Sequence, residues 1–112
     1  TLDEDTYSRE IAPLAGFYRS LYLGVPWWFI DAPESIMRFK QSVTEMASFS
    51  RISGMIDDTR AFCSIPARHD MMRRLDAAHL ANLVAVYRLD EDEAIAQAIK
   101  LVDDNPKKVF NL

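Results

Sequence analysis

Residues 51–60 read Arg-Ile-Ser-Gly-Met-Ile-Asp-Asp-Thr-Arg, and this stretch decides the fold. The first six residues are rich in apolar side chains, and Gly54 would allow another segment to approach closely. The last four residues are mostly charged, which indicates that burial ends there. The pattern predicts a short buried strand over Arg51–Ile56, followed by an exposed polar loop that begins at Asp57.

A second apolar run lies upstream of this strand. Ser20–Gly24 has the composition of a strand, and beyond an interruption at Pro26 the run continues with Trp27, Trp28 and Phe29. Apolar side chains on both faces are typical of a strand that is covered by helices on each side. The two runs therefore predict two strands that are buried inside the same fold.

Two helices are expected before residues 51–60. The first is Thr6–Leu14, which Pro13 and Gly16 should terminate. The second begins at residues 31–34, Asp-Ala-Pro-Glu, where Asp31 caps free amides, the proline fits the first turn and the glutamate completes a capping box. The predicted buried stripe of this second helix is Ile36, Phe39, Val43 and Met46.

Three further helices are expected after residues 51–60. The longest follows Pro66, and the next begins at Asp90 with Glu93 in capping-box register. A short terminal helix begins with Asn105 as its N-cap and Pro106 in its first turn. The residues expected to be buried are Met72, Leu75, Leu80, Leu83 and Val84 in the longest helix, and Ile95, Ile99 and Val102 in the next one.

The order helix, strand, helix, strand and then helices is typical of an α/β fold with parallel strands and right-handed crossovers. Two strands alone cannot cover both faces and both edges of a sheet. The sequence therefore predicts part of an α/β barrel or sheet, predominantly helical with two short parallel strands. No linker, internal repeat or low-complexity segment divides residues 1–112, so a single unit is expected.

The composition argues against several classes of protein. The net charge is −4 and the basic residues are scattered, so neither nucleic acid nor an anionic membrane surface is expected as a partner. The longest apolar run, Val25–Ile30, is too short to span a bilayer, and acidic residues at positions 3–5 are unlike a signal peptide. A single cysteine, Cys63, excludes an internal disulfide and fits a reducing compartment, so a cytoplasmic location is expected.

Candidate functional residues follow the two strands. In a parallel α/β barrel the loops after the strands form the catalytic face, so Asp58 is a candidate metal ligand and Arg60 a candidate partner for a substrate carboxylate. Trp27 and Trp28 end the other strand and face opposite ways, so one of them is a candidate for the wall of a pocket while the other packs outward. A solvated acidic turn and ordinary tryptophan packing explain the same residues, and on spacing alone they are the more common explanation.

The two histidines and the cysteine suggest no second site. His69 and His79 are ten residues apart on one expected helix, which places them on different sides of it, so they do not form a metal-binding pair. His69 is expected to hydrogen-bond near the start of that helix. Cys63 has no metal-ligand partner at useful spacing and is expected to be a packed thiol.

Taken together, these segments resemble the uronate isomerases. That family carries a Trp-Trp-Phe strand end, a Gly-Met/Phe-x-x-Asp-Ser/Thr-Arg-Ser/Ala-Phe segment, and an Arg-His-Asp/Glu helix start followed by a basic pair. The matching segments here are Trp27–Phe29, Gly54–Phe62, Arg68–Asp70 and Arg73–Arg74. Residues 1–5 resemble the exit from the preceding strand, so the resemblance covers nearly the whole chain.

The resemblance implies a (β/α)₈ barrel of TIM type that belongs to the amidohydrolase superfamily. The uronate isomerase family interconverts D-glucuronate and D-fructuronate. Residues 1–112 would be its C-terminal segment, from the end of strand 6 through strand 8 and the final helices. Asp58 would be the catalytic carboxylate and a ligand of a divalent metal, usually assigned as zinc. Arg60 and Trp27 would bind the substrate, and Asp57 would have no direct role.

The sequence departs from the family by lacking the His-x-His metal pair that follows the first barrel strand. One carboxylate does not hold zinc well, because such sites normally use three protein ligands. The chain alone is therefore expected to bind no metal tightly and to be inactive. Its expected partners are a hexuronate, the remainder of the barrel and, through an unpaired sheet edge, further copies of itself. The alternatives are a barrel that acts on another sugar acid and a helical interaction module without catalysis.

Overall fold

Five α-helices make up most of the chain that the computed structural model describes, which is residues 7–24, 31–57 and 61–112. The mostly helical composition predicted from the sequence is confirmed. None of these helices is long and apolar enough to cross a membrane. The helices are α1 (Tyr7–Phe17), α2 (Pro33–Ala47), α3 (Ile65–Ala85), α4 (Glu91–Val102) and α5 (Asp104–Phe110), with single 3₁₀ turns at η2 (Phe49–Arg51) and η3 (Phe62–Ser64).

The two predicted strand regions meet in parallel, but through one bridge only. Leu23 pairs with Ile52: the Leu23 N–H donates to the Arg51 carbonyl oxygen at 2.8 Å, and the Ser53 N–H donates to the Leu23 carbonyl oxygen at 2.9 Å. The parallel direction agrees with the prediction. The predicted lengths are wrong, because neither region forms a strand over the residues that the structure describes.

Local turns explain why the pairing is so short. Arg51 belongs to η2, and its N–H donates to the Ser48 carbonyl oxygen at 3.3 Å. On the other side, the Leu21 N–H donates to the Tyr18 carbonyl oxygen at 3.1 Å. Backbone donors just before the bridge are therefore used within each segment and are not available to a ladder. Trp27–Phe29, the predicted extension of the upstream strand, lies outside the described residues.

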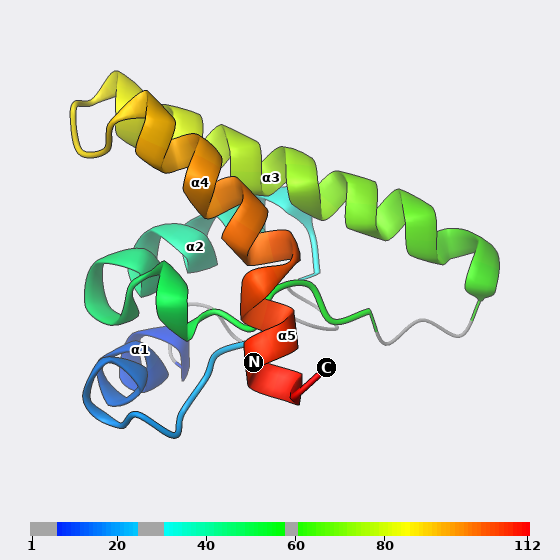
Figure 1. The fold of residues 1–112 in the computed structure, drawn as a ribbon, viewed down its shortest axis with the longest axis horizontal. Helices are drawn as coiled ribbons and strands as arrows, with labels where there is room; N and C mark the ends of the chain where they lie inside the picture. Colours follow the sequence, from blue (N-terminus) through cyan, green and yellow to red (C-terminus); the bar gives the residue numbers. More distant parts are fainter. Residues whose placement is uncertain (1–6, 25–30, 58–60) are drawn as a thin grey trace.

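Helix α1 continues to Phe17, past the two residues that were expected to terminate it. Pro13 lies inside the helix, and Gly16 is placed where α1 crosses α2. A Cβ atom on Gly16 would lie 2.3 Å from the Met46 carbonyl oxygen. The predicted end at Leu14 is wrong because Gly16 serves the close approach of two helices and does not end one (Figure 1).

Helix α2 starts with Pro33 in its first turn, as predicted. Its buried face includes Ile36, Phe39 and Val43, also as predicted, but Met46 is 55% exposed and Ala47 is buried in its place. Because α1 packs on the backbone of α2 at residue 46, only a small side chain fits the end of that face. The predicted stripe is therefore right for three of its residues and wrong for Met46.

Helices α3 and α4 form an antiparallel pair, with α4 (orange) lying along the second half of α3 (Figure 1). Helix α3 begins beside Pro66 as expected, and it buries Met72, Leu80 and Leu83, with Leu75 and Val84 partly buried.

The predicted buried stripe of α4 is wrong. Ile95, Ile99 and Val102 are each more than half exposed, whereas Ala94 and Leu101 are buried. Helix α4 packs through its alanine side, where small side chains let two helix backbones approach. The larger apolar residues are therefore left on its outer surface. A periodic apolar pattern does not show which of two adjacent apolar stripes packs inward.

The C-terminal helix α5 is tied to the segment around the parallel bridge. Asn105 lies inside α5, and its Nδ2 donates to the carbonyl oxygens of Phe49 at 2.8 Å and Ile52 at 3.0 Å. The prediction of Asn105 as an N-cap is wrong, because its amide satisfies carbonyls of a distant turn. Gly54, at φ +85°, lies under this helix: a Cβ there would be 2.6 Å from Cγ of Pro106.

Gly54→Ala should destabilise the chain much more than Gly24→Ala. At Gly54 the new methyl group also meets the Leu101 carbonyl oxygen at 2.7 Å, and the positive φ adds strain, for a loss of about 2–4 kcal/mol. At Gly24 it meets the end of the Ile56 side chain at 3.4 Å and Ser53 Oγ at 3.8 Å, both ordinary contacts, so we expect a change of no more than about 1 kcal/mol. Urea unfolding followed by far-UV circular dichroism measures both. Equal losses would show that α5 does not pack on Gly54.

Candidate functional site

The three residues predicted to act on substrate and metal, Asp58, Arg60 and Trp27, lie outside the described residues. The structure does describe the chain on either side of them. Asp57 directly precedes Asp58 and lies three residues before Arg60, and Asp31 follows the tryptophan by four residues. What the structure shows of the site is therefore the arrangement of its flanking residues.

Asp31 and Asp57 both bind one guanidinium group, that of Arg68 in the first turn of α3. Arg68 Nη2 lies 2.5 Å from Asp31 Oδ2, and Arg68 Nε lies 2.8 Å from Asp57 Oδ1. We call these three residues the Arg68 junction. Nε and Nη2 are neighbouring nitrogens of one guanidinium, so a single cation joins the two carboxylates.

The junction lies at the C-terminal end of the parallel pair. Leu23 and Ile52 are paired in parallel, and Asp31 and Asp57 follow them in sequence. Arg68 joins these two acids, and in a parallel barrel the residues that follow the strands form the catalytic face. Helix α3 then returns to this end with Arg68 in place.

The Arg68 junction is largely withdrawn from water. The Asp57 side chain is 4% exposed and that of Asp31 is 12% exposed. Partial burial lowers the pKa of Arg68, but its hydrogen bonds to the two carboxylates outweigh this and raise the pKa above its ordinary value, so the group is always charged. Asp57 Oδ2 is buried and accepts no hydrogen bond from the described residues.

The prediction that Asp31 caps helix α2 is wrong. The N-cap is Ala32, which makes no side-chain hydrogen bond, and the Asp31 carboxylate turns to Arg68 instead. Sequence reasoning also missed the joining role of Arg68, although the residue belongs to the Arg-His-Asp segment that resembles the uronate isomerases. An arginine shortly after an acidic loop was the available signal.

The described residues do not by themselves form a metal site. Within residues 7–24, 31–57 and 61–112, no three histidine, cysteine, aspartate or glutamate side chains gather closely enough to hold an ion. Asp57 is the acid nearest in sequence to Asp58, and its Oδ1 is already bound to Arg68. A metal bound at Asp58 would need further ligands from elsewhere.

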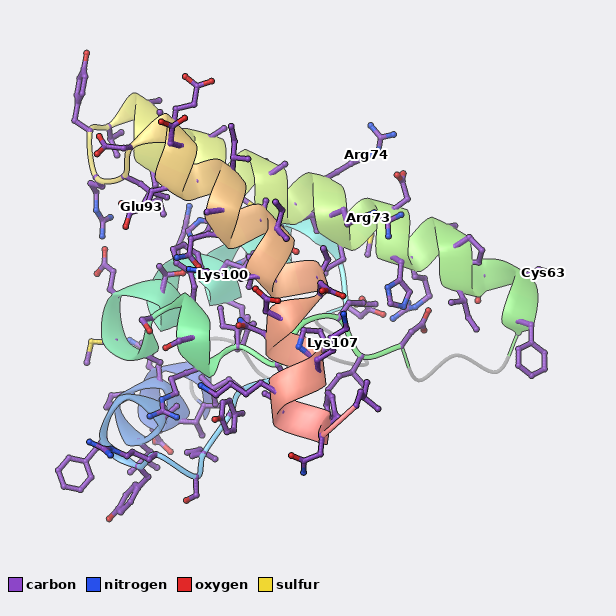
Figure 2. The ribbon with its side chains drawn as sticks, in the orientation of Figure 1. Cys63, Arg73, Arg74, Glu93, Lys100 and Lys107 are labelled. Atoms are coloured by element: carbon purple, nitrogen blue, oxygen red, sulfur yellow. The ribbon has the colours of Figure 1, made fainter. Side chains whose placement is uncertain are left out.

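The thiol of Cys63 is exposed, so the prediction of a packed cysteine is wrong. It lies in η3, at the end of α3 farthest from the turn to α4 (Figure 2). The neighbouring Phe62 is 89% exposed, so this turn projects from the rest of the chain. An apolar neighbourhood in the sequence did not show that the turn stands clear of the core.

Both histidines lie on α3, as predicted. His69 is half-buried beside a small cavity that it lines with Met55, Arg73 and Asp76 among others. His79 is buried, and it belongs to a polar cluster between α2 and α3 that also contains Thr44 and the ion pair of Lys40 with Asp76. Neither histidine therefore lies in the Arg68 junction.

The hydrogen bonds of Thr44 determine the state of His79. The Thr44 hydroxyl donates its one hydrogen to the Lys40 carbonyl oxygen at 2.7 Å, so it accepts from His79 Nε2 at 3.0 Å. Nδ1 is then a bare, buried acceptor without a partner among the described residues. Burial lowers the pKa of His79, and the charge of Lys40 lowers it further, against an opposing effect of Asp76. The imidazole is neutral in the folded chain at pH 7.

Comparison with known proteins identifies relatives of this chain. Residues 5–110 match the family model for glucuronate isomerase. The uronate isomerase of Cutibacterium acnes is 75% identical and that of Corynebacterium efficiens is 52% identical; each alignment covers all of this chain and 24% of the relative. The chain thus spans about a quarter of the length of these curated relatives.

Two solved structures have the same fold over nearly the whole chain. The glucuronate isomerase of Caulobacter crescentus superposes with a TM-score of 0.94 at 56% identity, covering 99% of this chain and 23% of that one. The uronate isomerase of Thermotoga maritima superposes with a TM-score of 0.92 at 27% identity, covering 97% of this chain and 24% of that one. This chain therefore has the fold of about a quarter of each of these larger proteins.

The free energy of unfolding should fall as pH is lowered, because of His79. The folded chain disfavours its protonation, whereas the unfolded chain binds the proton below about pH 6.5. The contribution of neutral His79 to the free energy of unfolding should be at its full value above about pH 7. It should decrease by up to about 1.4 kcal/mol per pH unit below about pH 6.5. Urea unfolding between about pH 7.5 and about pH 5.5 measures this slope.

His79→Gln is the matched control for this pH dependence. The glutamine amide retains a donor for Thr44 but cannot be protonated in this range. Its slope should be smaller than that of the native chain. An unchanged slope would assign the pH dependence to other groups.

Proposed function

Because the chain belongs to the glucuronate isomerase family, we propose that it forms the last quarter of a (β/α)₈ barrel that interconverts D-glucuronate and D-fructuronate. On this proposal Leu23 lies in the seventh barrel strand and Ile52 in the eighth. Residues 1–112 then run from the end of strand 6 through strand 8 to the final helices. The reaction belongs to hexuronate catabolism in the cytoplasm.

Two observations support this proposal. The family model extends over residues 5–110, which is nearly the whole chain. The parallel pairing of Leu23 with Ile52 and the Arg68 junction bring the ends of both segments together. The match to the family model is the observation that carries the proposal.

The proposed roles follow from the chemistry of an aldose–ketose isomerisation, in which a proton moves between adjacent sugar carbons. Arg60 binds the uronate carboxylate, since a planar guanidinium matches a carboxylate with two parallel hydrogen bonds. Trp27 forms an apolar wall of the sugar pocket. Asp58 is the catalytic carboxylate, at the loop after the eighth strand.

A divalent metal, zinc, is proposed for the complete enzyme, where it would polarise a sugar oxygen. Asp58 is the one residue of this chain that we assign to it. Since the described residues do not gather three ligands, the other ligands are proposed to come from the remainder of the barrel. The chain alone is therefore proposed to be inactive and to bind zinc weakly.

The proposed partners are a hexuronate substrate and the remainder of the barrel, with neither nucleic acid nor membrane. The exposed Ile95, Ile99 and Val102 on α4 give the chain an apolar outer surface. Such a surface suits contact with further protein, whether the rest of the barrel or a second copy in a homo-oligomer.

A chimera tests the proposal. Residues 1–112 replace the matching quarter of the Cutibacterium acnes uronate isomerase, to which they are 75% identical. We expect the chimera to turn over D-glucuronate, and Asp58→Asn to lower kcat by about 100-fold or more. Arg60→Lys should raise KM by about 10-fold, because lysine cannot form the paired hydrogen bonds.

The isolated chain is the matched control and should show neither turnover nor tight one-to-one binding of zinc. An active isolated chain would refute the need for the remainder of the barrel. A folded chimera that does not act on D-glucuronate, with a native Cutibacterium acnes enzyme that does, would refute the proposed function.

A further inference from the structure

We propose that Arg68 is a positioning residue of the isomerase site, because it joins Asp31 to Asp57, the described acids that flank the segments with Trp27 and Asp58. This role rests on the function proposed above and goes beyond it, because Arg68 itself touches neither substrate nor metal. It acts through the two carboxylates of the Arg68 junction.

Electrostatics supports this role. Asp31 and Asp57 place two carboxylates on neighbouring nitrogens of a single guanidinium, with their side chains 12% and 4% exposed and that of Arg68 28% exposed. Two like charges that are held near each other repel, and more strongly where water is partly excluded. The Arg68 cation turns that repulsion into a link between Asp31 and Asp57. Without it these two residues are expected to move apart.

The position of Asp57 in the chain also supports this role. Asp57 is joined by one peptide bond to Asp58, the proposed catalytic carboxylate, so any shift of its backbone moves that residue as well. The bridge at Ile52 fixes the start of the same segment, five residues earlier. Arg68 fixes its end at Nε, 2.8 Å from Asp57 Oδ1. The segment that leads to the site is therefore held at both ends.

Arg68 contacts both Asp31 and Asp57 and belongs to a third segment of the chain. It belongs to α3, whose packing is set by Met72, Leu80 and Leu83 farther along the helix. A helix anchored in the core supplies a more rigid support than either loop could supply to the other. Displacements of about 1 Å at reacting groups lower rates by up to about 100-fold, so such a support matters for catalysis.

The test uses the chimera with Arg68→Met. We expect the kcat/KM for D-glucuronate to fall by about 10- to 100-fold, through both kcat and KM, because Asp58, Arg60 and Trp27 all belong to the two segments that Arg68 anchors. Arg68→Lys keeps the charge but not the two neighbouring nitrogens, and it should recover part of the lost kcat/KM. Amide hydrogen exchange of the peptides that contain Asp31 and Asp57 should become faster in Arg68→Met.

Arg74→Met is the matched control. Arg74 is on the same helix and pairs with Asp70 at 2.8 Å, but this pair is exposed, and Arg74 points away from the rest of the chain (Figure 2). Its substitution should leave kcat, KM and the exchange of both peptides unchanged. If Arg68→Met folds and behaves like Arg74→Met, the positioning role is refuted while the proposed function stands.

A second variant covers the case in which Arg68→Met does not fold. The triple variant Arg68→Met, Asp31→Asn, Asp57→Asn removes the cation together with both buried charges, so no carboxylate is left without a partner. It should fold and still show the lower kcat/KM and the faster exchange. A triple variant with native kcat/KM would overturn the inference. An inactive native chimera would instead overturn the proposed function, and with it the role of Arg68.

Discussion

The parallel pairing of Leu23 with Ile52 is the constraint on which the rest of the structure depends. Two backbone hydrogen bonds join segments from either side of α2, and their parallel direction sends both onward to the same end of the molecule. There Arg68 joins the next charged residues, Asp31 and Asp57. A short backbone contact thus determines where two loops meet, and one cation determines how closely they meet.

Small residues allow the helices to pack closely around this pair. Gly16 lets α1 lie against the backbone of α2, and Gly54 lets the start of α5 lie against the segment beyond the bridge. Ala94 does the same for α4. Close backbone approach excludes water from the centre and keeps the bridge hydrogen bonds strong. The larger apolar side chains of α4 remain outside, on a surface suited to contact with other protein.

Local signals in the sequence predicted the helices well, since Pro33 and Pro66 mark helix starts and the stripe from Ile36 to Val43 is buried. Signals that depend on distant partners were misread. Asp31 has the spacing of a cap, and Asn105 has that of an N-cap, yet each binds a group that is remote in sequence. The family resemblance predicted the family, which the comparisons confirm, while the roles of Asp58, Arg60 and Trp27 stay predictions. An ion pair such as that of Arg68 leaves no periodic trace.

The side-chain amide of Asn105 has a consequence for the order of events during synthesis. Its two acceptors, the carbonyls of Phe49 and Ile52, are translated long before it, with 53 residues separating Ile52 from Asn105. A ribosome adds about 5–20 residues per second, so Asn105 is added several seconds after these carbonyls, and the two hydrogen bonds cannot form before then. The segment that leads to the proposed site therefore gains these two hydrogen bonds only after α5 has been synthesised.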